Sequence, residues 1–259
     1  MWNYEQRPFD IPDAGDVFRE VIAAGSTVTL IGPSDGPWRD PSPLLVGHLV
    51  GPCGKVYIAD PNENYINPLR ISLGGPDVQC GSVTQFLKCI EAFKEAGFPL
   101  PEYAWLGPDS GIFHIPEEAD VLVDHGTAQY VLQVKPDLRD PLDRSISTIA
   151  QTYWNALRPG GTLLWQVNST TALGWGLSMK DFIGFFQNAL NSVGFDAIQH
   201  LEVEDVYRIP VPEDSVERIR AIRAFLGGTI YDNERFLVNG CLLFDSPHHN
   251  CPDMFVARK

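Results

Sequence analysis

The chain has 259 residues, enough for one α/β domain with an insertion or for two small domains, and 44% of them are apolar, as in proteins that bury a core. Its formal net charge is −14, whereas a protein that binds duplex nucleic acid normally presents a basic surface, so we expect no nucleic-acid partner. No segment approaches the roughly 18 consecutive apolar residues of a membrane span, and the first residues lack the features of a signal peptide. The five cysteines suit free thiols. Together these features favour a cytoplasmic protein.

Amphipathic segments alternate with short apolar runs along most of the chain, an alternation typical of a parallel α/β sheet. The runs expected to form strands are 27–31, 55–59, 103–106, 120–123, 162–167, 195–203 and 254–257, the last of them at an edge of the sheet. The segments expected to form helices are 16–24, 82–96, 146–157, 178–193 and 215–225. Gly25, Gly97 and Gly194 are predicted to stop three of them, because glycine readily adopts the left-handed conformation at a helix C-terminus.

The segment 205–250 interrupts this alternation and lies between the last two predicted strands. We interpret it as an insertion within a single domain that spans 1–259. It contains the predicted helix 215–225, with Asp214 as its cap, and an apolar run at 236–244. Two roles stay open for it, a lid over a ligand or a contact in a homodimer. The other irregular stretch, 61–81, is longer than most loops in compact domains, and such loops often fold over ligands.

A glycine-bearing turn, Gly32-Pro33-Ser34-Asp35-Gly36, follows the first predicted strand. A turn of this kind between a strand and a helix lets a nucleotide-like ligand approach the backbone, although a plain connection is the other interpretation. Asp60 ends the second predicted strand, where a carboxylate can accept hydrogen bonds from both hydroxyls of a ribose. Together the two features favour a nucleotide-like ligand at this edge of the sheet.

Three stretches in order carry a resemblance to a known family: 28–36, 54–61 and 157–164, the last (LRPGGTLL) being the most specific. They resemble the first two motifs and the turn into the fifth strand of class I S-adenosylmethionine (SAM) methyltransferases. The resemblance covers about 15–204 plus the terminal strand. It implies a Rossmann-like, doubly wound α/β fold: a mostly parallel seven-stranded sheet with helices on both faces, and SAM as the cofactor.

The resemblance also implies roles for particular residues. The turn after the first strand would hold the methionine part of SAM, the end of the second strand the ribose, and an acidic position after the third strand the adenine amino group. The cofactor-binding residues implied in this way are Gly32, Ser34, Asp35, Gly36, Asp60, Asp109 and Ser110.

The chain departs from the family at two positions of the first motif. Leu30 stands where an acidic residue usually helps to hold the methionine amino group, and Ser34 stands where a glycine usually makes room for the ligand. Asp35 could supply the missing carboxylate from a shifted position. These departures leave open a non-enzymatic member of the fold with altered cofactor binding.

Asp124 and His125 end the fourth predicted strand, which in the family lies near the transferred methyl group. An imidazole titrates near neutrality, so His125 is the candidate base that takes a proton from the nucleophile. Asp124 would orient this base or face a substrate amine. A histidine that merely forms a hydrogen bond at a strand end is the competing interpretation. Tyr153 and Trp165 are expected in the core or wall of the domain rather than in the chemistry.

The turn at 32–36 also satisfies G-x-S-x-G, the nucleophile elbow of α/β-hydrolases, with Ser34 as the nucleophile. Asp124 and either His248 or His249 would complete the triad. Two observations disfavour this alternative. The elbow would follow the first strand rather than a later one, and prolines at 37, 41 and 43 oppose a helix that starts directly after the serine.

Two further groups of side chains lie in the insertion. Cys241, His248, His249 and Cys251 are potential metal ligands, but their spacing lacks the paired C-x-x-C knuckles of zinc sites, and we predict no metal. Arginines at 218, 220 and 223 give the predicted helix either a solvated face or a site for an anionic partner. The sequence as a whole predicts a methyltransferase that uses SAM and acts on a small-molecule acceptor.

Overall fold

The computed structural model describes residues 11–31, 42–59, 90–105, 118–125, 142–167, 178–204, 206–215, 217, 237–238, 241–245 and 253–259. Within them lie a seven-stranded sheet, in the order β3-β2-β1-β4-β5-β10-β6, and a three-stranded sheet, in the order β7-β9-β8. The strands of the large sheet are β1 (Thr27–Ile31), β2 (Lys55–Ala59), β3 (Glu102–Trp105), β4 (Ala119–His125), β5 (Leu157–Val167), β6 (Asp196–Glu202) and β10 (Asp253–Arg258). Those of the small sheet are β7 (Val206–Pro210), β8 (Leu237–Val238) and β9 (Cys241–Asp245).

The large sheet is mostly parallel, which confirms the predicted Rossmann-like α/β fold. Strands β1 to β5 pair in parallel, and only β10 runs against its neighbours β5 and β6. The prediction that the terminal strand lies at an edge is wrong, because β10 sits between β5 and β6, and β6 forms the edge. Met254 and Phe255 point to opposite faces and are both fully buried, as expected for a strand covered on both sides.

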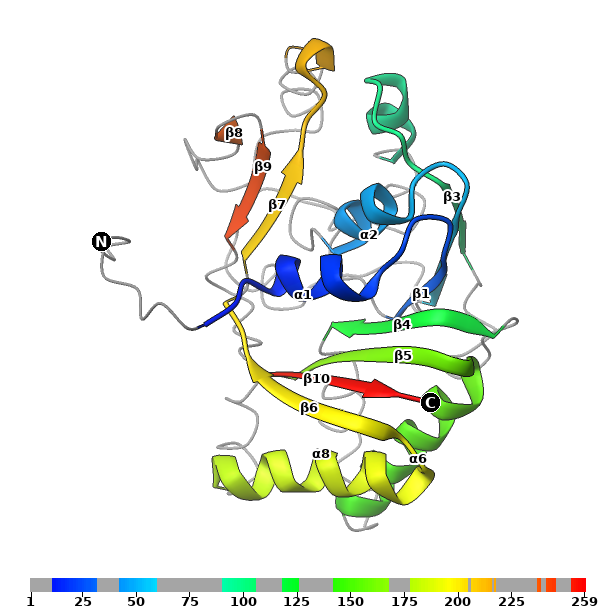
Figure 1. Cartoon of the computed structure of the whole chain (residues 1–259), viewed down its shortest axis with the longest axis vertical. Helices are drawn as coiled ribbons and strands as arrows, with labels where there is room; N and C mark the ends of the chain where they lie inside the picture. Colours follow the sequence, from blue (N-terminus) through cyan, green and yellow to red (C-terminus); the bar gives the residue numbers. More distant parts are fainter. Residues whose placement is uncertain are drawn as a thin grey trace, which may run out of the picture.

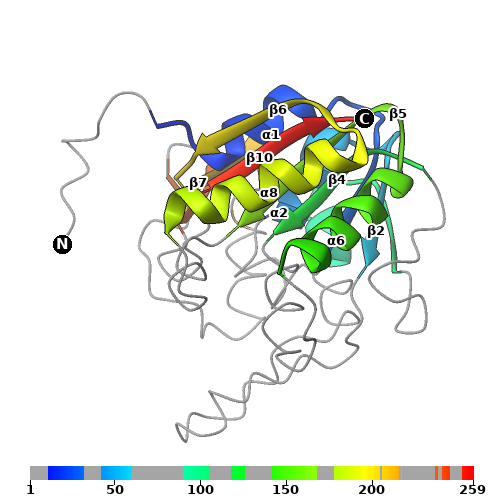
Figure 2. The same ribbon diagram turned by 90° about the horizontal axis from the view of Figure 1, so that it is seen from below.

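Helices cover both faces of the large sheet, as Figures 1 and 2 show. Helices α1 (Ala14–Val21) and α2 (Ser42–Val50) pack on one face with Val28, Leu30 and Val123. Helices α6 (Leu142–Ala156) and α8 (Met179–Val193) pack on the other face, where Trp165 and Phe255 lie in the same apolar cluster. Alternate residues of each strand therefore supply two separate cores.

The helix boundaries follow local capping signals where these are strong. Ser178 caps α8 by accepting a hydrogen bond from the Asp181 backbone N–H at 3.2 Å, and Gly194 ends the helix in the left-handed conformation, as predicted. Residues 90–95 are helical and Gly97 is left-handed, which confirms the predicted stop there. The other described helices differ more from expectation. Helix α1 starts two residues earlier than predicted and ends at Val21, because Ile22 is extended.

Helix α2 was not predicted from the sequence. Prolines at 37, 41 and 43 argue against a helix that starts directly after Ser34, and α2 instead begins at Ser42, so that Pro43 stands in its first turn. A proline is tolerated there because the backbone N–H groups of the first turn have no intrahelical partner. The predicted helix 215–225 falls almost wholly outside the described residues, which place the 3-10 turn η3 (Glu213–Ser215) before it.

The Arg158–Gly161 region, predicted as a turn into the fifth strand, is a bulge inside β5. Ala119 of β4 pairs with Leu157, and Val121 already pairs with Thr162, so several residues of β5 loop out of the ladder. Gly160 is left-handed at the tip, with φ 79°. The bulge lies at the amino end of β5, on the side away from the predicted ligand.

The segment between β6 and β10, which we interpret as an insertion, carries the small sheet. Strand β7 was not predicted, and its Tyr207 and Ile209 are fully buried in the core formed with α1 and α2. The described residues of the apolar run at 236–244 belong to β8 and β9, which pair antiparallel. Among the described residues, no helix combines the length and the apolar character needed to cross a membrane.

Replacing Phe255 by alanine should test the central position of β10. Phe255 is fully buried and stacks on Phe186 with ring centroids 5.5 Å apart. Because its loss leaves a cavity in the core, we expect the free energy of unfolding to fall by about 3–5 kcal/mol. Urea denaturation would measure this. The control Met179→Ala removes a side chain that is 42% exposed and should change stability by less than about 0.5 kcal/mol. Equal losses in the two variants would contradict a central β10.

Candidate functional site

The order of the strands reverses at β1, which has β2 on one side and β4 on the other. In open α/β sheets, ligands bind outside the carboxyl ends of the strands at such a switch point. The ends of the three strands are level, because Ile31 of β1 pairs with both Ala59 of β2 and Asp124 of β4. The polar residues that directly follow β1 and β2 in the sequence therefore start at one edge, beside the end of β4.

All seven predicted cofactor-binding residues lie outside the described part of the chain. These are Gly32, Ser34, Asp35, Gly36, Asp60, Asp109 and Ser110. Their roles stay predictions. What the described strands contribute is the position from which they start, since Gly32 follows Ile31 and Asp60 follows Ala59. A bound nucleotide would need both segments at the same edge of the sheet, and the register of β1 and β2 meets this requirement.

Leu30, the residue that departs from the family's acidic position, belongs to the hydrophobic core. It is 1% exposed and packs in the cluster formed with α1 and α2. An apolar side chain is stabilising at this position, whereas a carboxylate there would need a partner. This location gives the departure a physical role in packing.

Asp124 is fully buried at the carboxyl end of β4 and forms a hydrogen bond to α6. The Tyr153 hydroxyl donates to its Oδ2 atom at 2.7 Å. Burial, together with the negative charge of Asp124 and this hydrogen bond, raises the pKa of Tyr153 well above its ordinary value of 10. The pair ties the end of a central strand to the helix that covers it. Tyr153 and Trp165 are buried core residues, as predicted.

His125 is the last residue of β4, and its backbone pairs with Gln166 of β5. Gln166 is fully buried, although it lies in a central strand. Its side-chain amide forms a hydrogen bond with the Tyr207 hydroxyl of β7, with Nε2 3.1 Å and Oε1 3.3 Å from the phenol oxygen. The insertion thus contacts the main sheet one residue before the end of β5, next to the predicted base.

Sequence reasoning missed this contact. The single amide in the apolar run TLLWQV was a signal for Gln166, because a buried polar side chain in a central strand needs a partner. No comparable signal existed for Tyr207, since β7 itself was not predicted.

A second missed contact joins β6 to β10. The His200 Nε2 atom lies 2.7 Å from Asp253 Oδ1, and Asp253 is 4% exposed. The His200 ring also packs on Phe255, with centroids 5.1 Å apart. Because 53 residues separate the two polar partners in the sequence, spacing could not reveal them.

The predicted group of metal ligands falls largely outside the described residues. Cys241 is the first residue of β9, whereas His248, His249 and Cys251 are not described. In the part of the chain that the structure covers, no three histidine, cysteine, aspartate or glutamate side chains come together as metal ligands. Cys53 and Cys241 are free thiols.

No family model and no curated protein matches this chain. Similar solved structures include a possible exported protein from Bordetella parapertussis, with 12% identity and a TM-score of 0.45 over 95% of this chain and 66% of that one. A SAM-dependent O-methyltransferase from Thermotoga maritima has 13% identity and a TM-score of 0.46, over 99% and 68%. A methyltransferase from Pyrococcus furiosus has 8% identity and a TM-score of 0.47, over 94% and 80%. The chain thus spans about two thirds of the first two proteins, and its fold is assigned from its own strand order.

Replacing Tyr153 by phenylalanine should affect stability differently at neutral and alkaline pH. At pH 8 we expect a loss of about 1–3 kcal/mol, because the buried Asp124 carboxylate loses a donor. Above about pH 10 the unfolded wild type releases the Tyr153 proton while the folded protein retains it, so wild-type stability falls by up to about 1.4 kcal/mol per pH unit. The variant lacks this contribution and should lose less. Denaturation with urea at both pH values measures the difference.

The control for this experiment is Gln151→Ala, which changes an exposed side chain of the same helix. It should follow the wild-type pH dependence with a stability change below about 0.5 kcal/mol. If Tyr153→Phe also kept the wild-type slope above pH 10, the raised pKa of Tyr153 would be refuted.

Proposed function

We propose that the protein is a SAM-dependent methyltransferase that acts on a small-molecule acceptor in the cytoplasm. The observation that carries the proposal is the switch point of the sheet, where the ends of β1, β2 and β4 are level. In the sequence, the turn 32–36 follows β1, Asp60 follows β2, and His125 is the last residue of β4. The resemblance of 28–36, 54–61 and 157–164 to methyltransferase motifs supports the same conclusion. The net charge of −14 favours a small molecule over a nucleic acid as the acceptor.

The proposed cofactor would be held by the segments that follow the first three strands. The turn with Gly32, Ser34, Asp35 and Gly36 would hold its methionine part, Asp60 would accept hydrogen bonds from its ribose hydroxyls, and Asp109 with Ser110 would contact its adenine. When bound, SAM supplies an activated methyl group. The chain's own contribution is to align acceptor and methyl group, since an in-line displacement depends mainly on positioning.

His125 is proposed as the general base of the transfer. The His125 imidazole would take the proton that the acceptor atom releases as this atom bonds to the methyl group. Asp124 has a supporting part in this proposal. Because its buried carboxylate is bound by Tyr153, it fixes the end of β4 from which His125 extends.

Calorimetric titration with SAM and with S-adenosylhomocysteine (SAH) tests the proposal. We expect micromolar binding to the wild type and affinity at least about tenfold weaker in Asp60→Ala, because charge-assisted hydrogen bonds to the ribose are worth about 1.5–3 kcal/mol each. The matched control is Asp196→Ala, an exposed aspartate at the amino end of β6, which should bind like the wild type.

Absence of SAM and SAH binding to folded wild type would overturn the proposal. It would leave the non-enzymatic member of the fold, which the departures at Leu30 and Ser34 already suggest. Equal loss of affinity in the Asp60 and Asp196 variants would locate the cofactor elsewhere on the molecule.

A further inference from the structure

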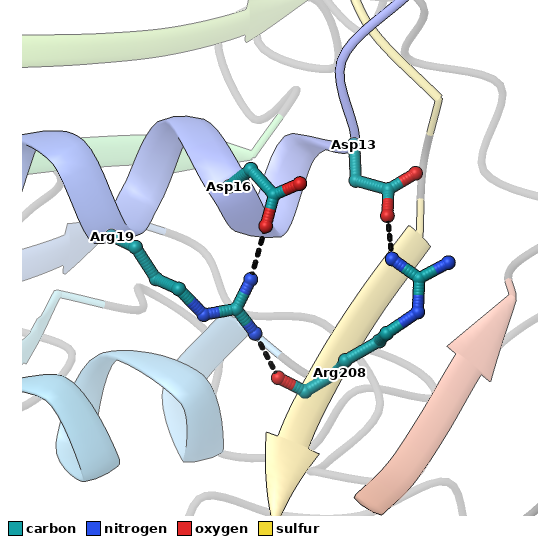
Figure 3. Close-up of polar contacts among 4 residues, drawn as sticks. All are labelled: Asp13, Asp16, Arg19 and Arg208. Atoms are coloured by element: carbon teal, nitrogen blue, oxygen red, sulfur yellow. Dashed lines mark hydrogen bonds and ion pairs between the residues drawn. The ribbon is translucent and has the colours of Figure 1, made fainter. Parts of the chain in front are cut away.

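The side chain at the N-cap position of α1 binds β7 instead of capping its own helix. Asp13 occupies the N-cap position, yet its side chain makes no capping hydrogen bond. Its carboxylate instead accepts a hydrogen bond from the Arg208 guanidinium of β7, as Figure 3 shows. N-cap aspartates ordinarily accept from a backbone N–H two or three residues further on. Here the carboxylate instead links the start of α1 to β7, the first strand of the insertion.

Two further residues of α1 serve the same contact. A Cβ atom on Gly15 would lie 3.2 Å from the Val206 carbonyl oxygen and 3.3 Å from the Tyr207 Cα atom, so the missing side chain lets the backbone of β7 approach the helix. Arg19 lies one turn further along the same face of α1. Its guanidinium donates to the Arg208 carbonyl and is itself held by Asp16 (Figure 3). Both the main chain and the side chain of Arg208 are therefore bound by α1.

These contacts between α1 and Arg208 fix the position of the neighbouring residue of β7, Tyr207. The Tyr207 ring packs edge-on against Phe18 of α1, with centroids 5.8 Å apart, and its hydroxyl reaches Gln166 near the carboxyl end of β5. Gln166 in turn pairs with His125 along the strands. A chain of buried contacts thus runs from α1 through β7 to the residue beside the proposed base.

The insertion is also anchored where it leaves and rejoins the sheet. Glu202, the last residue of β6, pairs with Asp253, the first of β10, so both ends of the insertion lie at the carboxyl edge. Backbone hydrogen bonds join Glu204 to the segment that enters α1. The Ala14 N–H donates to the Glu204 carbonyl oxygen at 2.8 Å, and the Glu204 N–H donates to the Pro12 carbonyl oxygen at 3.0 Å. Figure 1 shows β7 rising from this edge beside α1. These anchors hold the two described ends of the insertion at the sheet and beside α1.

We propose that α1 and β7 form a seat that positions the acceptor-side wall of the active site, with Asp13, Gly15 and Arg19 as positioning residues. They act through Tyr207 and Gln166. The inference rests on the proposed function and assigns the insertion to the acceptor rather than to a subunit contact. The seat lies between α1 and β7 and reaches β5 through Tyr207 and Gln166, rather than the ends of β1 and β2. Its loss therefore raises the KM for the acceptor and leaves the affinity for SAH unchanged.

The test compares Asp13→Asn and Gly15→Ala with the control Glu20→Gln, an exposed carboxylate on the same helix. Asparagine caps helices as well as aspartate, and alanine favours a helix over glycine, so neither variant weakens α1 itself. SAH affinity is measured by calorimetry. Methyl transfer from labelled SAM is measured on a panel of phenols, carboxylic acids, amines and thiols, and KM is determined for each compound that the wild type methylates.

We expect an acceptor KM about tenfold higher in both variants, with SAH affinity within twofold of the wild type. Asp13→Asn weakens the hydrogen bond to a charged group, which is worth about this factor, and Gly15→Ala displaces the backbone of β7 from α1. Tyr207→Phe should raise the KM similarly, and the double variant Asp13→Asn, Tyr207→Phe should be no worse than the poorer single variant, because both changes act on one contact. Purely structural damage would instead give additive effects and would lower SAH affinity as well.

Three results would overturn the inference. One is an unchanged acceptor KM in both seat variants, and another is an equal loss of SAH and acceptor binding. The third is SAH binding by a wild type that methylates no compound of the panel, which refutes a small-molecule acceptor and with it this role for the seat. Failure of SAH to bind the wild type at all is distinguishable from these, since it overturns the proposed function itself.

Discussion

The position of β10 constrains the rest of the molecule. A strand near the end of the chain lies between β5 and β6 and runs against both, so the chain must leave the sheet at the end of β6 and re-enter it at the same edge. Everything inserted between these strands begins and ends at the carboxyl edge, where α/β sheets bind their ligands. The sheet topology thus brings the small sheet beside the candidate site.

Local signals in the sequence predicted those parts of the fold that local energetics decide. Strands β1 and β2 have the predicted bounds because short, mostly apolar runs between glycine and proline turns leave little choice of strand ends. Helix α8 begins one residue after its predicted start and ends where predicted, because Ser178 and Gly194 supply both caps. The predicted cofactor-binding site uses the same information, since Gly32 and Asp60 directly follow those strands, and it stays a prediction.

The parts that the sequence did not reveal depend on contacts between distant residues. The run at 254–257 has the composition of a buried strand, but only pairing with β5 and β6 decides that it is central rather than at an edge. Strand β7 is short, and its stability comes from packing on α1 and α2 rather than from periodicity. The pair of His200 and Asp253 joins two strands that are neighbours in space and separated by the whole insertion in the sequence.

The polar contacts at the carboxyl edge are divided between the two faces of the sheet. Asp124 and Tyr153 tie the end of β4 to α6 on one face, and Gln166 and Tyr207 tie the end of β5 to β7 on the other. Each pair is buried, where an unsatisfied partner is costly, so each favours one arrangement of its strand end. Strand ends fixed from both sides give the residues that follow them defined starting points. Such fixed strand ends suit the proposed transfer, which depends on aligning two reactants beside the proposed base, His125.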